Sequence, residues 1–86
     1  MDFTGKIAIV TGGAGGIGAA IAKALHARGA RVACCDLDGA KADAVAQACG
    51  GIGKAVNVAD EGEVAVFITE VERKMGPVDM YFSNAG

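Results

Sequence analysis

The stretch "VTGGAGGIGAA" at residues 10–20 places five glycines between Gly12 and Gly18. Glycine costs about 0.5–1 kcal/mol relative to alanine inside a regular element, so this density indicates a backbone that something approaches closely. The stretch follows an apolar, β-branched run at residues 6–11, typical of a buried strand, and a helical pattern begins at Gly16. A glycine-rich turn between a strand and a helix is suited to phosphate, because the first helical N–H groups are unpaired and carry partial positive charge.

Two glycine registers fit this turn. The pattern G-x-G-x-x-G uses Gly13, Gly15 and Gly18, and the pattern T-G-x-x-x-G-x-G uses Thr11, Gly12, Gly16 and Gly18. Glycine spacing alone does not choose between them, and glycines that serve only to pack the helix on the strand are a third interpretation. A Walker A loop is excluded, because alanines rather than Lys-Ser/Thr follow Gly18.

The rest of the chain alternates strand and helix patterns. Further strands are expected at residues 31–36, 53–58 and 78–83, and helices at residues 16–28, 39–49 and 60–75. Such alternation with short connections predicts a parallel sheet with right-handed crossovers. We therefore expect one α/β domain over residues 1–86, a Rossmann-type, doubly wound half with strand order 3-2-1-4 and the fourth strand at an edge.

Two of the helices have patterns that predict their buried side. In the first, the apolar face consists of Ile17, Ile21, Ala24 and Leu25. In the last, the stripe consists of Val64, Phe67, Ile68, Val71 and Met75. Asp60, with Glu63 three residues later, predicts a capping box at the start of that last helix.

Composition narrows the class of protein. The 86-residue chain is 52% hydrophobic with a net charge of −2, which argues against disorder, nucleic-acid binding and an anionic membrane surface. We see no secretory signal, and no apolar run approaches the ~18 residues of a membrane span. The odd set Cys34, Cys35 and Cys49 lacks C-x-x-C spacing, so we expect buried thiols without a disulfide or metal site, in a reducing cytoplasm.

Polar residues at the predicted strand ends indicate a nucleotide. Asp36 ends the second strand, where a carboxylate accepts hydrogen bonds from ribose hydroxyls and repels a 2′-phosphate. Leu37 follows it and Gly15 brings no cation to the turn, so NAD is favoured over NADP. The alternative is that Asp36 only caps the next turn, although Asp38 fits that role better. The segment "SNAG" at residues 83–86 ends the fourth strand at the ligand-binding edge, or is a plain turn.

Together these residues resemble the short-chain dehydrogenase/reductase family. The resemblance rests on Thr11-Gly12-x-x-x-Gly16-Ile17-Gly18, Asp36, Asn57-Val58 and Asn84-Ala85-Gly86. It implies a glycine turn on the cofactor pyrophosphate, Asp36 on the adenine ribose, Asn57-Val58 beside adenine, and the N-A-G segment on the nicotinamide side. The implied NAD-binding residues are Gly12, Gly15, Gly16, Ile17, Gly18, Asp36, Leu37, Asn57, Val58, Asn84, Ala85 and Gly86.

The resemblance has departures. The family usually has Asp at position 57 and often Asn at position 83, where this chain has Asn57 and Ser83. Family chemistry uses a serine, a Tyr-x-x-x-Lys and an asparagine further along the chain, whereas Tyr81 is followed four positions later by Ala85. We therefore expect no catalytic residue here, and an 86-residue chain that is inactive alone.

The resemblance thus implies the amino-terminal, NAD-binding part of a homo-oligomeric oxidoreductase whose small-molecule substrates are alcohols or carbonyls. The first alternative is a non-catalytic module that binds a nucleotide or serves only in assembly. A second alternative is a methyl-donor site for S-adenosylmethionine, against which Thr11 and the N-A-G segment argue.

Overall fold

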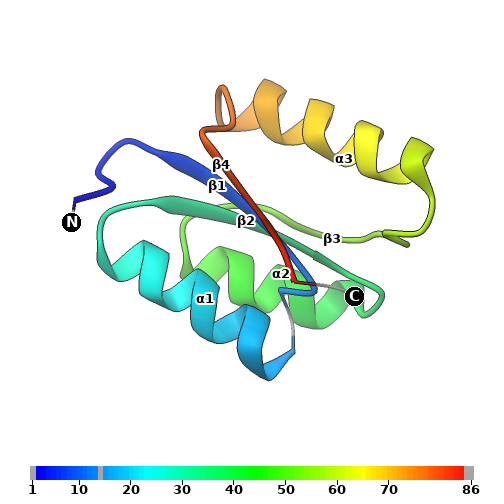
Figure 1. Ribbon diagram of the computed structural model, residues 1–86, viewed down its shortest axis with the longest axis horizontal. Helices are drawn as coiled ribbons and strands as arrows, with labels where there is room; N and C mark the ends of the chain where they lie inside the picture. The colour runs from blue at the N-terminus through cyan, green and yellow to red at the C-terminus, as the bar shows by residue number, and fades with distance from the viewer. Residues whose placement is uncertain (1, 14, 85–86) are drawn as a thin grey trace.

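A computed structural model of the chain describes residues 2–13 and 15–84. Within that part the chain forms a parallel sheet in the order β3-β2-β1-β4, with a helix between successive strands (Figure 1). The elements are β1 (Ile7–Thr11), α1 (Gly16–Ala27), β2 (Arg31–Asp36), α2 (Gly39–Ala48), β3 (Gly53–Ala55), α3 (Glu61–Lys74) and β4 (Met80–Ser83). The predicted fold class, strand order and edge position of the fourth strand are confirmed.

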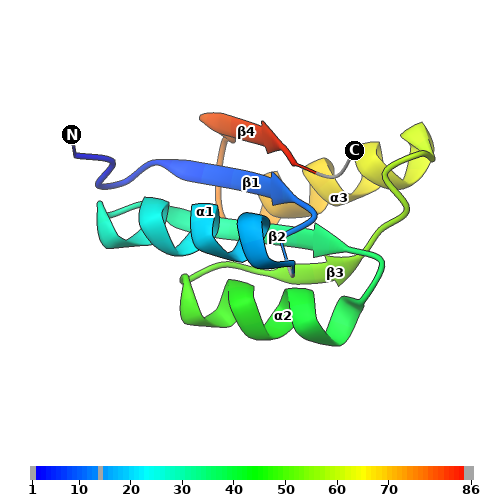
Figure 2. The ribbon, with the colours of Figure 1, turned by 60° about the horizontal axis from the view of Figure 1, so that its bottom comes forward.

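Helices cover both faces of the sheet. Helices α1 and α2 lie on one face and α3 on the other (Figures 1 and 2). Alternate residues of β1 enter the two resulting cores: Val10 packs with α1 and α2, and Ile9 packs with α3 around Phe67. Both strand side chains are fully buried, which explains the unbroken apolar run of this central strand.

The third strand is shorter than predicted. It comprises Gly53–Ala55 rather than residues 53–58, and its ladder pairs it with Cys34–Asp36 of β2. Because β2 ends at Asp36, the residues after Val56 have no neighbouring strand to pair with. Asn57 and Val58 therefore lie in the connection to α3.

The predicted apolar face of α1 was wrong in part. Ile17 is 72% exposed and Ala24 is exposed, whereas Gly18, Ala22 and Leu25 are buried. The cause is the docking of Gly18, where a Cβ atom would collide with the carbonyl oxygen of Gly12. A backbone contact at a glycine, which hydropathy patterns do not register, sets the rotation of this helix.

The predicted stripe of α3 is confirmed, since all five of its residues belong to one core with Phe67 and Val71 fully buried. The capping box forms only in part. Asp60 Oδ1 accepts from the N–H groups of Gly62 and Glu63 at 2.9 and 3.2 Å. The carboxylate of Glu63 accepts from Asn57 N instead of returning to Asp60 N.

The edge strand β4 is tied to β1 by side chains at both ends. At the start, Ile7 N donates to Asp79 Oδ2 at 2.9 Å, and Asp79 N donates to Ile7 O at 2.8 Å. At the far end, Asn84 N donates to Thr11 Oγ1 at 3.0 Å. Sequence analysis did not single out Asp79.

Truncation of two adjacent residues of α3 should have very different effects on the stability of the protein. Phe67→Ala removes a fully buried ring and should lower the free energy of unfolding by about 3–5 kcal/mol. Val66→Ala truncates a neighbour that is 60% exposed and should change it by less than about 0.5 kcal/mol. Urea unfolding followed by circular dichroism measures both, and similar losses would contradict the packing described.

Candidate functional site

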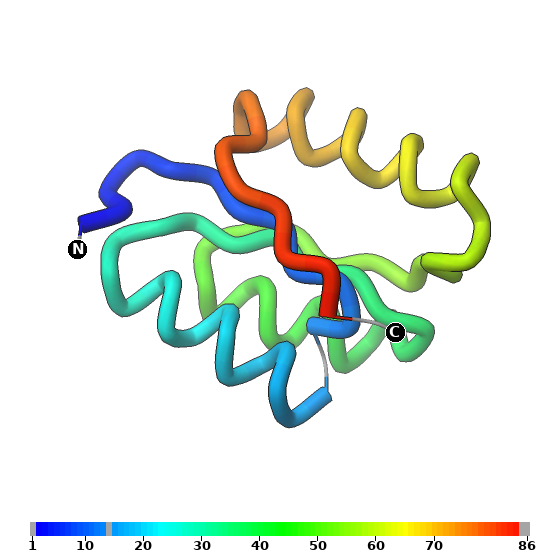
Figure 3. The backbone as a smooth tube through the Cα atoms, viewed as in Figure 1, coloured from blue at the N-terminus to red at the C-terminus, as the bar shows by residue number. Residues whose placement is uncertain are grey.

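The carboxyl ends of the parallel strands bring the predicted site residues to one edge. Thr11 pairs with Cys35 of β2 and with Ser83 of β4. Beyond Ser83, the side-chain amide of Asn84 donates to Gly12 O at 3.3 Å, so the end of β4 lies beside the glycine turn (Figure 3). The amide of Asn84 therefore serves to join this segment to the turn.

Three glycines of the turn are required by the fold itself. Gly12 has φ +66°, a left-handed conformation that favours glycine. A Cβ at Gly18 would collide with Gly12 O, and a Cβ at Gly13 would lie 2.8 Å from Cys34 Cβ. The interpretation that glycines serve helix packing is supported for Gly18, whereas Gly12 is required by its backbone conformation and Gly13 by its contact with β2.

Packing does not account for the other two glycines. A Cβ at Gly15 would have its nearest neighbour, Gly12 O, at 3.9 Å, and a Cβ at Gly16 would meet nothing within 4 Å. Both residues are exposed, and they occupy the N-cap and first position of α1. Their missing side chains leave the backbone open to a group that approaches from solvent.

The start of α1 differs from the starts of the other helices. Asp38 caps α2 by accepting from Lys41 N at 3.1 Å, and Asp60 caps α3. No side chain of the described residues caps α1, and its first turn contains no acidic residue. The first N–H groups of a helix need an acceptor, and a phosphate supplies it with favourable charge. The backbone of this turn therefore fits a pyrophosphate group.

Asp36 lies at the end of β2, half-buried, next to the connection that carries Asn57. Its Oδ1 accepts from Asp38 N at 3.1 Å, so it takes part in the turn as well as standing at the predicted ligand edge. Its carbonyl accepts from Val56 N at 2.9 Å, which holds Asn57 close to the end of β2. Leu37, which follows, is 78% exposed.

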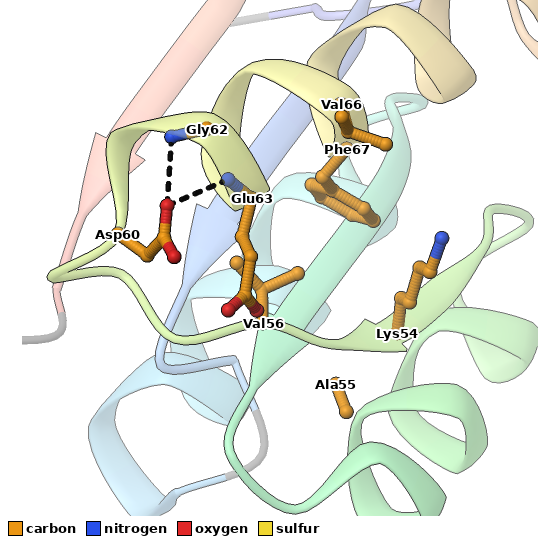
Figure 4. Close-up of a pocket in the computed structure, with 8 residues that line it drawn as sticks. All are labelled: Lys54, Ala55, Val56, Asp60, Gly62, Glu63, Val66 and Phe67. Atoms are coloured by element: carbon orange, nitrogen blue, oxygen red, sulfur yellow. Dashed lines mark hydrogen bonds between the residues drawn. The ribbon is translucent and has the colours of Figure 1, made fainter.

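Asn57 and Val58 face different surroundings. Asn57 is exposed, and its Oδ1 accepts from Ala59 N at 3.0 Å. Val58 is half-buried against the core under α3, and with Thr11 and Ser83 it lines a hollow of about 320 Å³. A larger hollow of about 420 Å³ lies between β3 and α3, and none of the predicted site residues lines it (Figure 4).

The three cysteines are free and buried. Burial raises the pKa of the Cys34 thiol to about 12 and that of Cys35 to about 11, so both thiols stay protonated at neutral pH. Among the described residues no cluster of His, Cys, Asp or Glu could hold a metal ion. None of the helices described has the length and apolarity to cross a membrane.

The structure therefore brings Gly12, Gly18 and Asn84 into one contact network and sets Asp36 beside Asn57. Gly15, Gly16 and Ile17 form the exposed start of α1. Ala85 and Gly86 lie outside the described residues. Sequence reasoning missed the bond from Asn57 N to Glu63, although the capping-box spacing marked Glu63 as a residue that bonds to backbone near the start of α3.

An open α/β sheet with a glycine turn at its carboxyl edge defines a nucleotide-binding class of fold. Residues 6–86 match the family model for short chain dehydrogenases, and the chain belongs to that family, whose members bind a nicotinamide cofactor.

The chain is also similar to individual oxidoreductases. The chain is 42% identical to a D-threitol dehydrogenase from Mycolicibacterium smegmatis and 40% identical to the 3-oxoacyl-[acyl-carrier-protein] reductase FabG from Escherichia coli. In each comparison the match covers 100% of this chain and 36% of the relative, so the chain spans about a third of their length.

A solved structure described as ribose-5-phosphate isomerase from Brucella melitensis superposes with a TM-score of 0.89 at 38% identity, over 99% of this chain and 33% of that one. It carries the same fold under the name of a different activity. One fold serves several chemistries, so the activity has to be argued from the site.

Two alanine substitutions in the glycine turn should differ in their effect on the free energy of unfolding. Gly18→Ala forces a Cβ against Gly12 O and should lower the free energy of unfolding by about 1–3 kcal/mol. Gly16→Ala adds a Cβ in open space at a helical position and should leave stability unchanged or slightly higher. Thermal unfolding compares the two, and equal losses would contradict the close approach of Gly18 to Gly12.

Proposed function

We propose that this chain is the amino-terminal, NAD-binding part of a dehydrogenase that transfers hydride between an alcohol and a carbonyl. Family membership and the named oxidoreductases among its relatives support the reaction class. The nicotinamide supplies the hydride chemistry when bound, and the protein supplies binding and orientation. The match spans about a third of each relative, and within the proposal residues 1–86 hold the cofactor while the catalytic residues lie elsewhere in the dehydrogenase.

The observation that carries the proposal is the uncapped, open start of α1. Gly15 N donates only a long bond to Gly12 O at 3.4 Å, α1 has neither a side-chain cap nor an acidic residue in its first turn, and a pyrophosphate would accept from the N–H groups there. Asp36 stands at the adjacent strand end, where it would accept from the adenine ribose. Asn57 and Val58 would flank the adenine, with Leu37 beside Asp36, and the segment from Asn84 through Ala85 to Gly86 would line the nicotinamide side.

Charge supports NAD over NADP. A carboxylate at position 36 repels a 2′-phosphate, and the next residue, Leu37, is apolar and exposed. The glycines at the start of α1 bring no cation to offset that repulsion. The three free, buried cysteines support a location of the protein in a reducing compartment such as the cytoplasm.

Calorimetry with NAD and NADP tests the proposal on the 86-residue chain. Asp36→Asn keeps an acceptor for the turn but loses the charge. It should weaken the binding of NAD about tenfold, which is the low end for the loss of a charge-assisted hydrogen bond. It should also reduce the ratio of the NAD affinity to the NADP affinity. Asp43→Asn makes the same charge change within α2 and should leave both affinities unchanged.

The outcomes separate the alternatives. An equal affinity for NAD and NADP that Asp36→Asn leaves unchanged would overturn the assignment of Asp36. Absence of heat from the unchanged chain at millimolar cofactor would leave the non-catalytic assembly module as the better interpretation.

We also propose self-association of the chain. Within residues 2–13 and 15–84, strand β4 pairs with β1 on one side and with no strand on the other, and its Tyr81 is 45% exposed. An apolar edge strand presents unpaired N–H and C=O groups that pair with another chain.

Sedimentation at high concentration checks the association. The unchanged chain should form dimers or larger species, and Tyr81→Lys should reduce them because a charge on an edge strand disfavours pairing. Val66→Lys adds the same charge to the exposed side of α3 and should not. A monodisperse monomer for the unchanged chain would show the proposal to be wrong.

A further inference from the structure

The connection between β3 and α3 is held by a set of short hydrogen bonds centred on Asn57. Its N–H donates to Glu63 Oε1 at 3.0 Å, and its carbonyl accepts from Asp60 N at 2.9 Å. Its side-chain Oδ1 accepts from Ala59 N at 3.0 Å. Three of the four polar groups of Asn57 are therefore engaged in fixing the connection.

The fourth group is the side-chain Nδ2, which donates to no described residue. Because Ala59 N–H needs an acceptor, the side-chain oxygen faces it and the amide orientation is settled. Nδ2 is then the group of Asn57 that can reach a ligand, and it offers two donors. An aspartate at this position would offer acceptors only.

Glu63 reaches this connection from the first turn of α3. Figure 4 shows its side chain extended from the helix toward the chain that follows Val56. Its own N–H is held by Asp60 Oδ1 at 3.2 Å, so the residue is anchored at its backbone while its carboxylate holds Asn57. A hydrogen bond to a carboxylate is stronger than a neutral one, which makes this bond the strongest of the three that hold Asn57.

We infer that Glu63 is a positioning residue for recognition of the adenine base: through the Asn57 N–H group it fixes the direction in which Asn57 presents Nδ2. The inference rests on the proposed function, because it requires a base beside Asn57. It assigns to Glu63 a role separate from capping, which Asp60 performs.

Two ligands and five variants of the 86-residue chain test this role. NAD contains the adenine, and nicotinamide mononucleotide lacks it. Glu63→Ala should weaken the binding of NAD about fivefold to tenfold and leave the affinity for the mononucleotide unchanged. Glu63→Gln keeps an acceptor and should recover most of the lost NAD affinity. Glu61→Ala removes the same charge from the same helical turn and should alter neither. In an Asn57→Ala background, Glu63→Ala should cause no further loss.

Hydrogen exchange at the Asn57 amide supplies a readout that needs no ligand. Exchange should accelerate in Glu63→Ala, stay slow in Glu61→Ala, and be intermediate in Glu63→Gln. Faster exchange with weaker NAD binding only in the Glu63 variants supports the inference.

The inference is overturned if Glu63→Ala binds NAD with unchanged affinity, or if its affinity for the mononucleotide falls as much as that for NAD. It is also overturned if the losses of binding free energy in Glu63→Ala and Asn57→Ala are fully additive. Absence of NAD binding by the unchanged chain overturns the proposed function, and this inference with it.

Discussion

The contact between Gly12 and Gly18 is the constraint on which the site depends. The carbonyl of Gly12 lies so close to Gly18 that a single methyl group would prevent it, and the same carbonyl accepts from Asn84. One peptide group therefore fixes the start of α1 against β1 and the end of β4 against both. Gly15 and Gly16 lie exposed between these two contacts, at the start of α1.

Much of the fold could be predicted because hydrophobic periodicity and turn residues agree along the chain. The buried strands β1 and β2 and the stripe of α3 follow from such patterns, and the order of the sheet follows from right-handed crossovers in the fold class that they indicate. Two predictions failed for one physical reason, which is that a neighbour far along the chain decided the outcome. The third strand ends where β2 ends, and α1 turns its face to suit a glycine contact rather than its isoleucines.

For the candidate site, too, some features could be predicted from the sequence and others could not. The residue types at the strand ends, above all the glycine turn and Asp36, indicate the ligand class from sequence alone. Their hydrogen-bond partners do not follow from sequence, because one carboxylate can accept from several nearby N–H groups. Glu63 illustrates this: spacing predicts a bond to Asp60 N, and the short β3 places Asn57 N within its reach instead.

The bonds that join β1 to β4 span almost the whole chain. Ile7 and Asp79 are 72 residues apart, and Thr11 and Asn84 are 73 residues apart. Contacts between such distant residues form late, because a long loop must close before they give any stabilisation. During synthesis on the ribosome, the bonds that join the end of β4 to Thr11 and to the glycine turn therefore cannot form until residue 84 has left the exit tunnel. The glycine turn is thus joined to a residue that lies 72 positions further along the chain.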